Sequence, residues 1–198
     1  REGVLTVNPV ARVRKPKPPR KKIDPFTPAE LAAIISAVTG TGRILALLAA
    51  TGMRVGEAIA LDCGDYDAAT GTLSITKTYH DKHGTGPPKS HNSVRTIRVP
   101  AQGRPAVAAA IGKRKVGVLF VAPKSGGRFK HSAVYMVFQR LQTRLGITPT
   151  RSLHQLRHSF ISHAIGAGVP IADAARYAGD SVGMIVARYL HPSGSDAS

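Results

Sequence analysis

The sequence predicts an α+β fold that is mostly helical and carries one small antiparallel sheet of about three strands. Three observations support this prediction. Apolar residues follow helical spacing over residues 26–61 and again from 101 to 189. Between these regions, residues 62–100 alternate polar and apolar side chains and contain many β-branched residues and glycines, which is typical of short strands and turns. A chain of 198 residues is long enough to bury one core built from these parts.

The first helix has a well-marked start. In FTPAELAAIISAV, Thr27 is the expected N-cap, Pro28 takes the first helical position and Glu30 follows three residues after the cap. Gly40 and Gly42 are expected to end this helix. The next segment, RILALLAATG, is so apolar that it predicts a buried helix, and RVGEAIAL begins a third helix.

Strands are expected in DYDAATGTLSITKTY and in SVRTIRVP. The loop DKHGTGPPKSHN is expected to link the last two strands of the sheet. Further helices are expected over residues 101–112, 131–145, 154–166, 170–178 and 183–189.

The charge of the chain indicates the class of its partner. The formal net charge is +17 and the pI is about 10.8. An excess of this size usually means a polyanionic partner, with nucleic acid first and an anionic membrane surface second. No apolar run of about 18 residues is present, so no transmembrane helix is expected. The single cysteine, Cys63, excludes an internal disulfide and a cysteine-based zinc site, and it fits a cytoplasmic setting.

Residues 1–22 differ in composition from the rest of the chain. The stretch ARVRKPKPPRKK is basic, rich in proline and free of acids, so it is expected to stay extended. We interpret residues 1–22 as an interdomain linker that lies along a phosphate backbone, and residues 23–198 as the folded domain. The start REGVLTVNPV suggests a piece of a longer protein with a domain missing upstream. The candidate DNA-binding residues of the linker are Arg12, Arg14, Lys15, Lys17, Arg20, Lys21 and Lys22.

One helical face concentrates histidine and arginine without a local acid. In LHQLRHSF, helical spacing puts His154, Arg157 and His158 on one face, and the nearest acids in the sequence are Asp173 and Asp81. The counter-charge must come from a distant carboxylate or from an external anion. A zinc site through both histidines is disfavoured because Arg157 would repel the cation. A histidine pair that cleaves RNA is disfavoured because both bases would lie on one side of the phosphate.

Three other positions carry chemistry that a plain helical domain does not need. Arg54, in TGMRVGEAIAL, is expected to be partly buried because apolar residues flank it. The alternative is that Arg54 only forms a weak surface salt bridge with Glu57 at i, i+3. Lys89 lies at an expected hairpin tip, where an ordinary exposed lysine is the simpler interpretation. Tyr189 lies near the end of the last helix, where a half-buried tyrosine that only packs is the simpler interpretation. Tyr177 is a second tyrosine that competes with Tyr189 as the candidate nucleophile.

Together these stretches resemble the tyrosine recombinase (phage integrase) family. TGMRVGEAIAL resembles the first arginine box of that family, HQLRHSF its H-x-x-R box, and AGDSVGMIVARYLHP its glycine–tyrosine box. The order and spacing of the three boxes make the signal strong, and the resemblance extends from about Ile23 to Pro192. It implies the helical catalytic domain of the family and site-specific strand exchange on duplex DNA, as in viral genome integration, without a metal or another cofactor.

The resemblance also implies roles for single residues. Arg54 and Arg157 match the two arginines that clamp the scissile phosphate. His154 matches the histidine that contacts this phosphate and assists proton transfer. Tyr189 matches the nucleophile that forms a 3′-phosphotyrosine link, because the spacing from the glycine box selects it over Tyr177.

The remaining roles are supporting ones. Lys89 matches the hairpin lysine that protonates the leaving 5′ oxygen, with Lys77 and Lys82 as alternatives in the same region. His158 matches a second histidine of the box that is commonly structural and buried by hydrogen bonding. Glu57 is expected to be structural and near the site.

Asp180 departs from the family pattern, which usually has histidine or tryptophan at this position as a donor to the phosphate. An ionised aspartate has no donor and would repel a phosphate. Three accounts stay open. Asp180 caps the start of the last helix, next to Ser181; or it pairs with Arg54 or Arg157 until DNA arrives; or it becomes protonated on DNA and donates a hydrogen bond.

Two alternatives to a recombinase remain at this stage. One is a non-catalytic relative that only binds DNA, and the other is a type IB topoisomerase, which shares the chemistry. The family implies a homotetramer on DNA, whereas this chain alone is expected to be a monomer.

Overall fold

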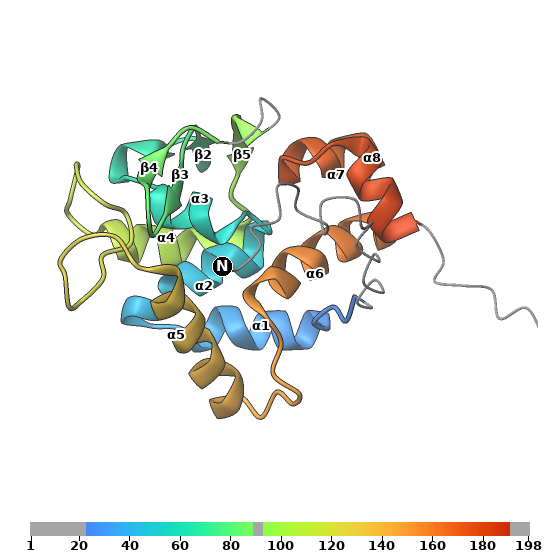
Figure 1. Cartoon of the computed structure of the whole chain (residues 1–198), viewed down its shortest axis with the longest axis horizontal. Coiled ribbons are helices and arrows are strands. Elements are labelled where there is room, and N and C mark those ends of the chain that lie inside the picture. The colour runs from blue at the N-terminus through green and yellow to red at the C-terminus, as the bar shows by residue number, and fades with distance from the viewer. Residues whose placement is uncertain (1–22, 89–92, 191–198) are drawn as a thin grey trace, which may run out of the picture.

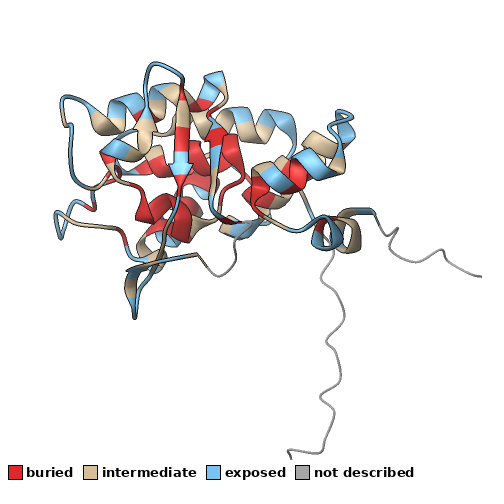
Figure 2. Cartoon of the chain, turned by 90° about the horizontal axis from the view of Figure 1, so that it is seen from above, coloured by how far each residue is buried: buried red, intermediate tan, exposed pale blue. Residues whose placement is uncertain are grey.

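Helix α2 (Arg43–Thr51) is the centre of the fold. The computed structural model describes residues 23–88 and 93–190. Every residue from 44 to 51 is buried, and α2 contacts α1, α3, α4, α5 and α6 (Figures 1 and 2). A helix without a polar face is stable only when other elements surround it. The prediction of a buried second helix is therefore confirmed.

Five of the other helices pack around α2, whereas α7 and α8 lie to one side of it (Figure 1). Helix α1 begins as predicted, because Thr27 Oγ1 accepts a hydrogen bond from the Glu30 amide at 3.2 Å and Glu30 Oε2 accepts one from the Thr27 amide at 2.7 Å. The bounds are α1 Pro28–Ala37, α3 Val55–Ala60, α4 Arg104–Ile111, α5 His131–Arg144, α6 Leu153–Gly166, α7 Ile171–Ala178, α8 Val182–Ile185 and the π-helical turn η6 Val186–Leu190, with short 3₁₀ turns at η2 Gly40–Gly42, η3 Cys63–Asp65 and η5 Ala101–Gly103.

The predicted three-stranded sheet is present. Strands β1 (Tyr66–Asp67), β2 (Thr72–Ile75) and β5 (Arg95–Arg98) pair antiparallel in the order β1-β2-β5. Leu73 is paired with Ile97, and both side chains are buried in the main core. This alternation of one buried face and one exposed face is what the sequence pattern predicted.

A second, two-stranded sheet was not predicted. Strand β3 (Thr78–His80) pairs antiparallel with β4 (Gly84–Gly86). The expectation of a loop over residues 84–86 is wrong. The segment GTG contains two glycines and no large apolar side chain, so composition gave no strand signal and only the backbone pairing defines it.

Helices α6, α7 and α8 form the right-hand part of the molecule in Figure 1 and have a small core of their own. This core contains Ile161, Ala175, Ala178 and Ile185, and the partly buried ring of Tyr189 packs against it. The segment that carries Tyr189 is therefore attached to α6 and α7 by apolar contacts.

None of the helices over residues 23–88 and 93–190 is both long and apolar enough to cross a membrane.

Candidate active site

A cavity of about 210 Å³ collects five of the candidate site residues. The residues come from the α2–α3 junction, from α6 and from the segment after α7, which are far apart in the sequence. Lys89 and the basic residues of 1–22 lie outside the described residues. The lining residues are Arg54, His154, Arg157, Asp180, Met184, Arg188 and Tyr189.

The turn between α2 and α3 positions two parts of this cavity. Helix α2 ends at Gly52, whose φ of +61° is a left-handed conformation that favours glycine. A Cβ atom at Gly52 would also lie 2.7 Å from the Phe160 side chain. The carbonyl of Gly52 accepts a hydrogen bond from Arg157 Nη1 at 2.9 Å. The turn therefore ends the buried helix and fixes the orientation of Arg157.

Arg54 follows this turn and is held on two sides. Its Nη1 donates to Glu57 Oε1 at 3.0 Å, and its Nη2 donates to the Gly179 carbonyl at 3.0 Å and to Asp180 Oδ1 at 2.5 Å. The side chain of Arg54 is 36% exposed, whereas that of Glu57 is 2% exposed. The predicted pair at i, i+3 is present, but the buried partner makes it more than a surface bridge.

Glu57 is also the partner of an arginine that sequence analysis missed. Arg95 on β5 donates from Nη2 to Glu57 Oε2 at 3.0 Å and from Nε to the Tyr177 carbonyl at 2.7 Å. Its side chain is 6% exposed. Burial would raise the pKa of Glu57, but Arg95 and Arg54 outweigh it and hold this pKa below its usual value. Arg95 thus connects the sheet and α7 to Glu57, and Glu57 in turn holds Arg54.

Asp180 lies between Arg54 and Arg157, two of the three arginines that line the cavity. Its Oδ1 accepts from Arg54 Nη2, and its Oδ2 accepts from Arg157 Nη2 at 2.6 Å. Burial would raise the pKa of Asp180, but Arg157 and Arg54 lower it below its usual value, so the carboxylate is ionised. The distant carboxylate that the face on α6 required is therefore Asp180.

This geometry separates the accounts of Asp180. Ser181, not Asp180, is the N-cap of α8, because its side chain accepts a hydrogen bond from the Met184 amide at 3.3 Å. The capping account is wrong, since both Asp180 oxygens are bound to arginines that lie far away in the sequence. The pairing account agrees with these contacts, and it involves both arginines rather than one.

Two histidines on α6 face different partners. His154 lines the cavity beside the arginines, and its ring lies edge-on to His158 with the ring centroids 4.6 Å apart. Burial, with the cations Arg157 and Arg188, lowers the pKa of His154. His158 is half-buried, and its Nδ1 lies 2.5 Å from the hydroxyl oxygen of Tyr189. The expected hydrogen bond of His158 is present, but it joins His158 to the candidate nucleophile rather than to a purely structural group.

The two candidate tyrosines have different surroundings. Burial raises the pKa of both hydroxyls to about 12. Tyr177 donates its hydroxyl to the Arg98 carbonyl at 2.7 Å and stacks on Phe160 with the centroids 5.1 Å apart. Tyr189 lines the cavity. The structure therefore separates a packing tyrosine from a tyrosine that faces the cationic groups.

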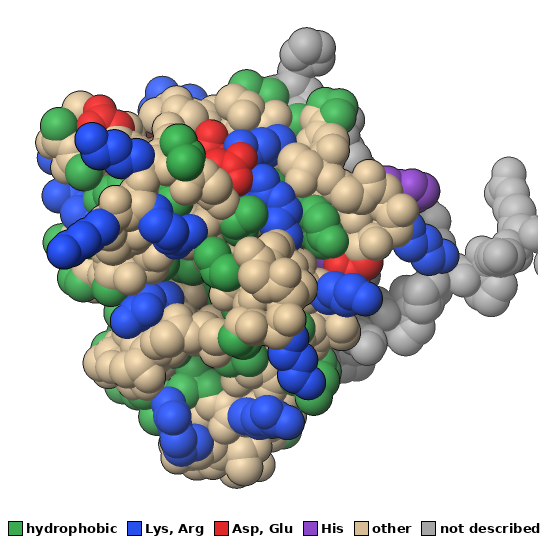
Figure 3. All heavy atoms as spheres, turned by 90° about the vertical axis from the view of Figure 1, so that its left-hand side faces the viewer, with side chains coloured by type: hydrophobic (Ala, Val, Ile, Leu, Met, Phe, Trp, Pro, Cys, Tyr) green, Lys and Arg blue, Asp and Glu red, His purple; other side chains and the backbone are tan. Residues whose placement is uncertain are grey.

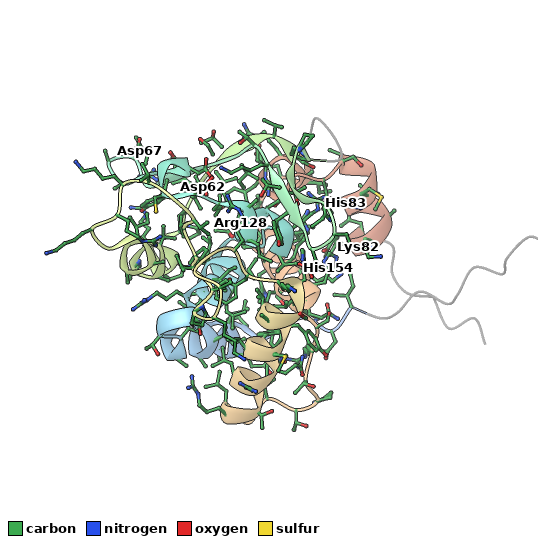
Figure 4. The ribbon with its side chains drawn as sticks, turned by 60° about the vertical axis from the view of Figure 1, so that its left-hand side comes forward. Asp62, Asp67, Lys82, His83, Arg128 and His154 are labelled. Atoms are coloured by element: carbon green, nitrogen blue, oxygen red, sulfur yellow. The ribbon has the colours of Figure 1, made fainter. Side chains whose placement is uncertain are left out.

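The two lysines named as alternatives to Lys89, Lys77 and Lys82, have different surroundings. Lys77 Nζ is bound by Asp62 at 2.6 Å and by Asp65 at 2.9 Å. Burial acts to lower the pKa of Lys77, but these carboxylates raise it, which makes the ammonium a weaker acid. Asp62 also binds Arg128, and Figure 4 shows this pair well separated from His154. Lys82 is exposed in the turn between β3 and β4, and Figure 4 draws it toward the same side as His154.

The charge of the surface is spread over several elements. On the face shown in Figure 3, which is remote from α7 and α8, Lys and Arg side chains are scattered rather than gathered into one band.

Over the described ranges, no group of three or more His, Cys, Asp and Glu side chains is placed to hold a metal ion.

Comparison with known proteins identifies relatives of this chain. The sequence model of the Phage integrase family matches residues 26–195. The tyrosine recombinase XerD of Mycobacterium leprae (strain TN) is 29% identical over 195 aligned residues, and the match covers 86% of this chain and 57% of the relative. This chain therefore spans little more than half the length of that relative.

Solved structures share the fold. The crystal structure of XerA recombinase superposes with a TM-score of 0.71 at 23% identity, covering 93% of this chain and 63% of that chain. The Tn1549 transposon integrase in complex with circular intermediate DNA gives a TM-score of 0.73 at 19% identity, covering 88% and 65%. The predicted fold, a helical catalytic domain of this kind with a small antiparallel sheet, is confirmed.

Proposed function

The chain belongs to the phage integrase family, and from this premise we propose that it is the catalytic part of a site-specific DNA recombinase. It cuts and rejoins duplex DNA through a 3′-phosphotyrosine link. The observation that carries the proposal is the convergence of three guanidinium groups, a histidine and a tyrosine in one cavity.

The arginines supply the charge that the reaction needs. A phosphodiester is already an anion, and negative charge builds up on its oxygens in the transition state. Guanidinium groups can each hold phosphate oxygens in a fixed geometry and neutralise this charge. Arg54 and Arg157 already hold the two oxygens of one internal anion, the Asp180 carboxylate. We infer that the scissile phosphate takes the place of this carboxylate, with His154 beside it.

Tyr189 is the nucleophile in this proposal. Its attack on phosphorus transfers the bond from the 5′ oxygen to the phenol, so the phosphotyrosine link conserves the energy of the broken backbone. Attack by a 5′ hydroxyl then reseals the strand without ATP, and attack by the hydroxyl of a second duplex gives recombination. Lys89 is proposed as the acid that protonates the leaving oxygen.

The net charge of +17 supplies affinity for DNA of any sequence, and this affinity should fall steeply with salt. We propose that residues 1–22 lie along the phosphate backbone as a basic linker. We also propose that four copies assemble on paired recombination sites, as strand exchange between two duplexes requires four cleavages.

Trapping of a covalent complex tests the proposal. The chain is incubated with a library of random-sequence duplexes that carry a nick, so that a cleaved strand loses a short fragment and cannot reseal. Covalent complexes are precipitated with SDS and sequenced, which also identifies the target. A non-catalytic DNA-binding protein would give none. A topoisomerase would relax supercoiled plasmid as a monomer, whereas a recombinase would exchange strands between paired sites.

Lys89→Ala is expected to slow cleavage of normal DNA by about 10²-fold, because the 5′ oxygen leaves without a proton. A substrate with sulfur at the bridging 5′ position should restore the rate, since a thiolate needs little protonation. Lys82→Ala is the matched comparison, measured on both substrates by single-turnover trapping. Rescue by sulfur in Lys82→Ala but not in Lys89→Ala would move the general acid to Lys82.

Asp180→Asn is expected to bind DNA roughly tenfold more tightly and to form the covalent complex faster, because an amide competes less well than a carboxylate for two guanidinium groups. Affinity is measured by fluorescence anisotropy and cleavage by trapping. Asp173→Asn makes the same change of charge at an exposed pair with Arg176 and should change both values little. An Asp180→Asn protein that folds but never cleaves, at any pH, would make the carboxyl group part of the chemistry instead.

A further inference from the structure

The contact between His158 and Tyr189 points to a role beyond the ones assigned above. Nδ1 of His158 is 2.5 Å from the Tyr189 hydroxyl oxygen, and the ring planes are tilted by 55°. We propose that His158 is the proton acceptor for Tyr189, which makes it a catalytic residue rather than a structural one. This inference rests on the proposed function, because it assigns one proton of the proposed reaction.

The direction of this hydrogen bond follows from the charges around it. The groups near His158 are His154 and Arg157 on the same helix, Arg188 on η6, and Asp180 after α7. Burial, with His154 and Arg188, lowers the pKa of His158 to about 4, so the ring is neutral at neutral pH. A neutral imidazole has one nitrogen without a proton, and a phenol donates more readily than it accepts. The hydroxyl of Tyr189 therefore donates to Nδ1, and the ring proton lies on Nε2.

The two histidines of the box then have separate tasks. They are one helical turn apart, at i and i+4, and His154 faces the arginines while His158 faces the tyrosine. As the Tyr189 oxygen bonds to phosphorus, its proton moves to His158 Nδ1. The bond from phosphorus to the 5′ oxygen breaks, and that oxygen takes a proton from the general acid. In the reverse direction, His158 returns its proton to the phenol as the 5′ hydroxyl attacks.

Tyr189 needs such an acceptor because it reacts from the neutral form. Burial raises the pKa of its hydroxyl to about 12, so very little phenolate is present at neutral pH. His158 is a weak base in the free protein. A phosphate that takes the place of the Asp180 carboxylate keeps a negative charge next to Arg157, and the further negative charge that builds up in the transition state makes His158 more basic as the reaction proceeds.

His158→Asn is the sharpest test, because the amide oxygen occupies the position of Nδ1 and can accept a hydrogen bond but cannot take a proton. We expect covalent complex formation to fall by about 10²-fold or more at pH 7. The rate of the variant should then rise about tenfold per pH unit, because phenolate must form without help. Wild-type rates should rise less over the same range. A wild-type rate in His158→Asn, or a loss that is equal at every pH, would show that the contact only orients the ring.

His163→Asn is the matched control on the same helix, where a ring nitrogen contacts the Phe26 carbonyl oxygen at 2.7 Å. It should lower the melting temperature but leave the pH profile of cleavage unchanged. A second measurement does not depend on DNA. ¹⁵N NMR of labelled histidine should show His158 with an unprotonated Nδ1 whose shift changes in Tyr189→Phe, and a proton on Nδ1 would overturn the proposal. If the wild type forms no covalent complex, the proposed function fails, while the NMR result still decides the direction of this bond.

Discussion

Tyr189→Phe is expected to bind DNA as tightly as the wild type and to form no covalent complex. The substitution removes only the hydroxyl, so the ring still packs against the small core of α6, α7 and α8. The basic surface that binds phosphates is unchanged. Binding is measured by anisotropy at two salt concentrations, and cleavage by trapping on a nicked duplex.

Tyr177→Phe is the matched control for this experiment. It loses the hydrogen bond to the Arg98 carbonyl, which should cost about 0.5–1.5 kcal/mol of stability. Its cleavage rate should remain that of the wild type at a temperature where it is folded. Cleavage by Tyr189→Phe together with inactivity of Tyr177→Phe would transfer the role of nucleophile to Tyr177.

Arg157→Lys should reduce cleavage by about 10²-fold or more, as expected for the loss of one donor to a developing charge. The guanidinium group donates to the Gly52 carbonyl and to Asp180 at the same time, in two directions that a single ammonium cannot match. Lysine keeps the charge, so binding should weaken by no more than about one phosphate contact. Arg157→Ala should lose as much activity, and it should also lower the stability of the fold because Asp180 keeps only one of its two arginine partners.

Arg144→Lys provides the comparison. Arg144 is on α5 and donates to the Ala37 carbonyl, outside the cavity. It should keep both binding and cleavage. If binding and cleavage fall by the same factor in Arg157→Lys, then Arg157 anchors DNA and does not stabilise the transition state.

The sequence predicted those parts of the fold that depend on local patterns. The Thr27 cap, the buried helix after Arg43 and the strands around Leu73 and Ile97 all follow from short-range spacing. Strand β4 was missed because Gly84 and Gly86 give no signal of their own. Its partner strand alone defines it.

The same holds for the candidate site, where contacts that depend on the tertiary fold were not predicted from the sequence. The three boxes selected Arg54, Arg157 and Tyr189, which share a cavity. Arg95 was missed because it looks like an ordinary residue of an alternating strand, and only the fold brings it to Glu57. The contact of Tyr189 with His158 could not be predicted, because η6 is a π-helical turn. Such a turn changes the angle per residue and so the direction in which Tyr189 points.

The most direct test of the central claim is to identify the amino acid that carries the DNA. Trypsin cleaves after Arg176 and after Arg188, so Tyr177 and Tyr189 each begin a separate peptide. The trapped complex is treated with nuclease and trypsin and analysed by mass spectrometry. We expect a 3′-phosphonucleotide on the peptide that begins with Tyr189 and none on the peptide that begins with Tyr177. A nucleotide on the Tyr177 peptide, or no nucleotide on any tyrosine of a chain that binds its DNA, would contradict the account.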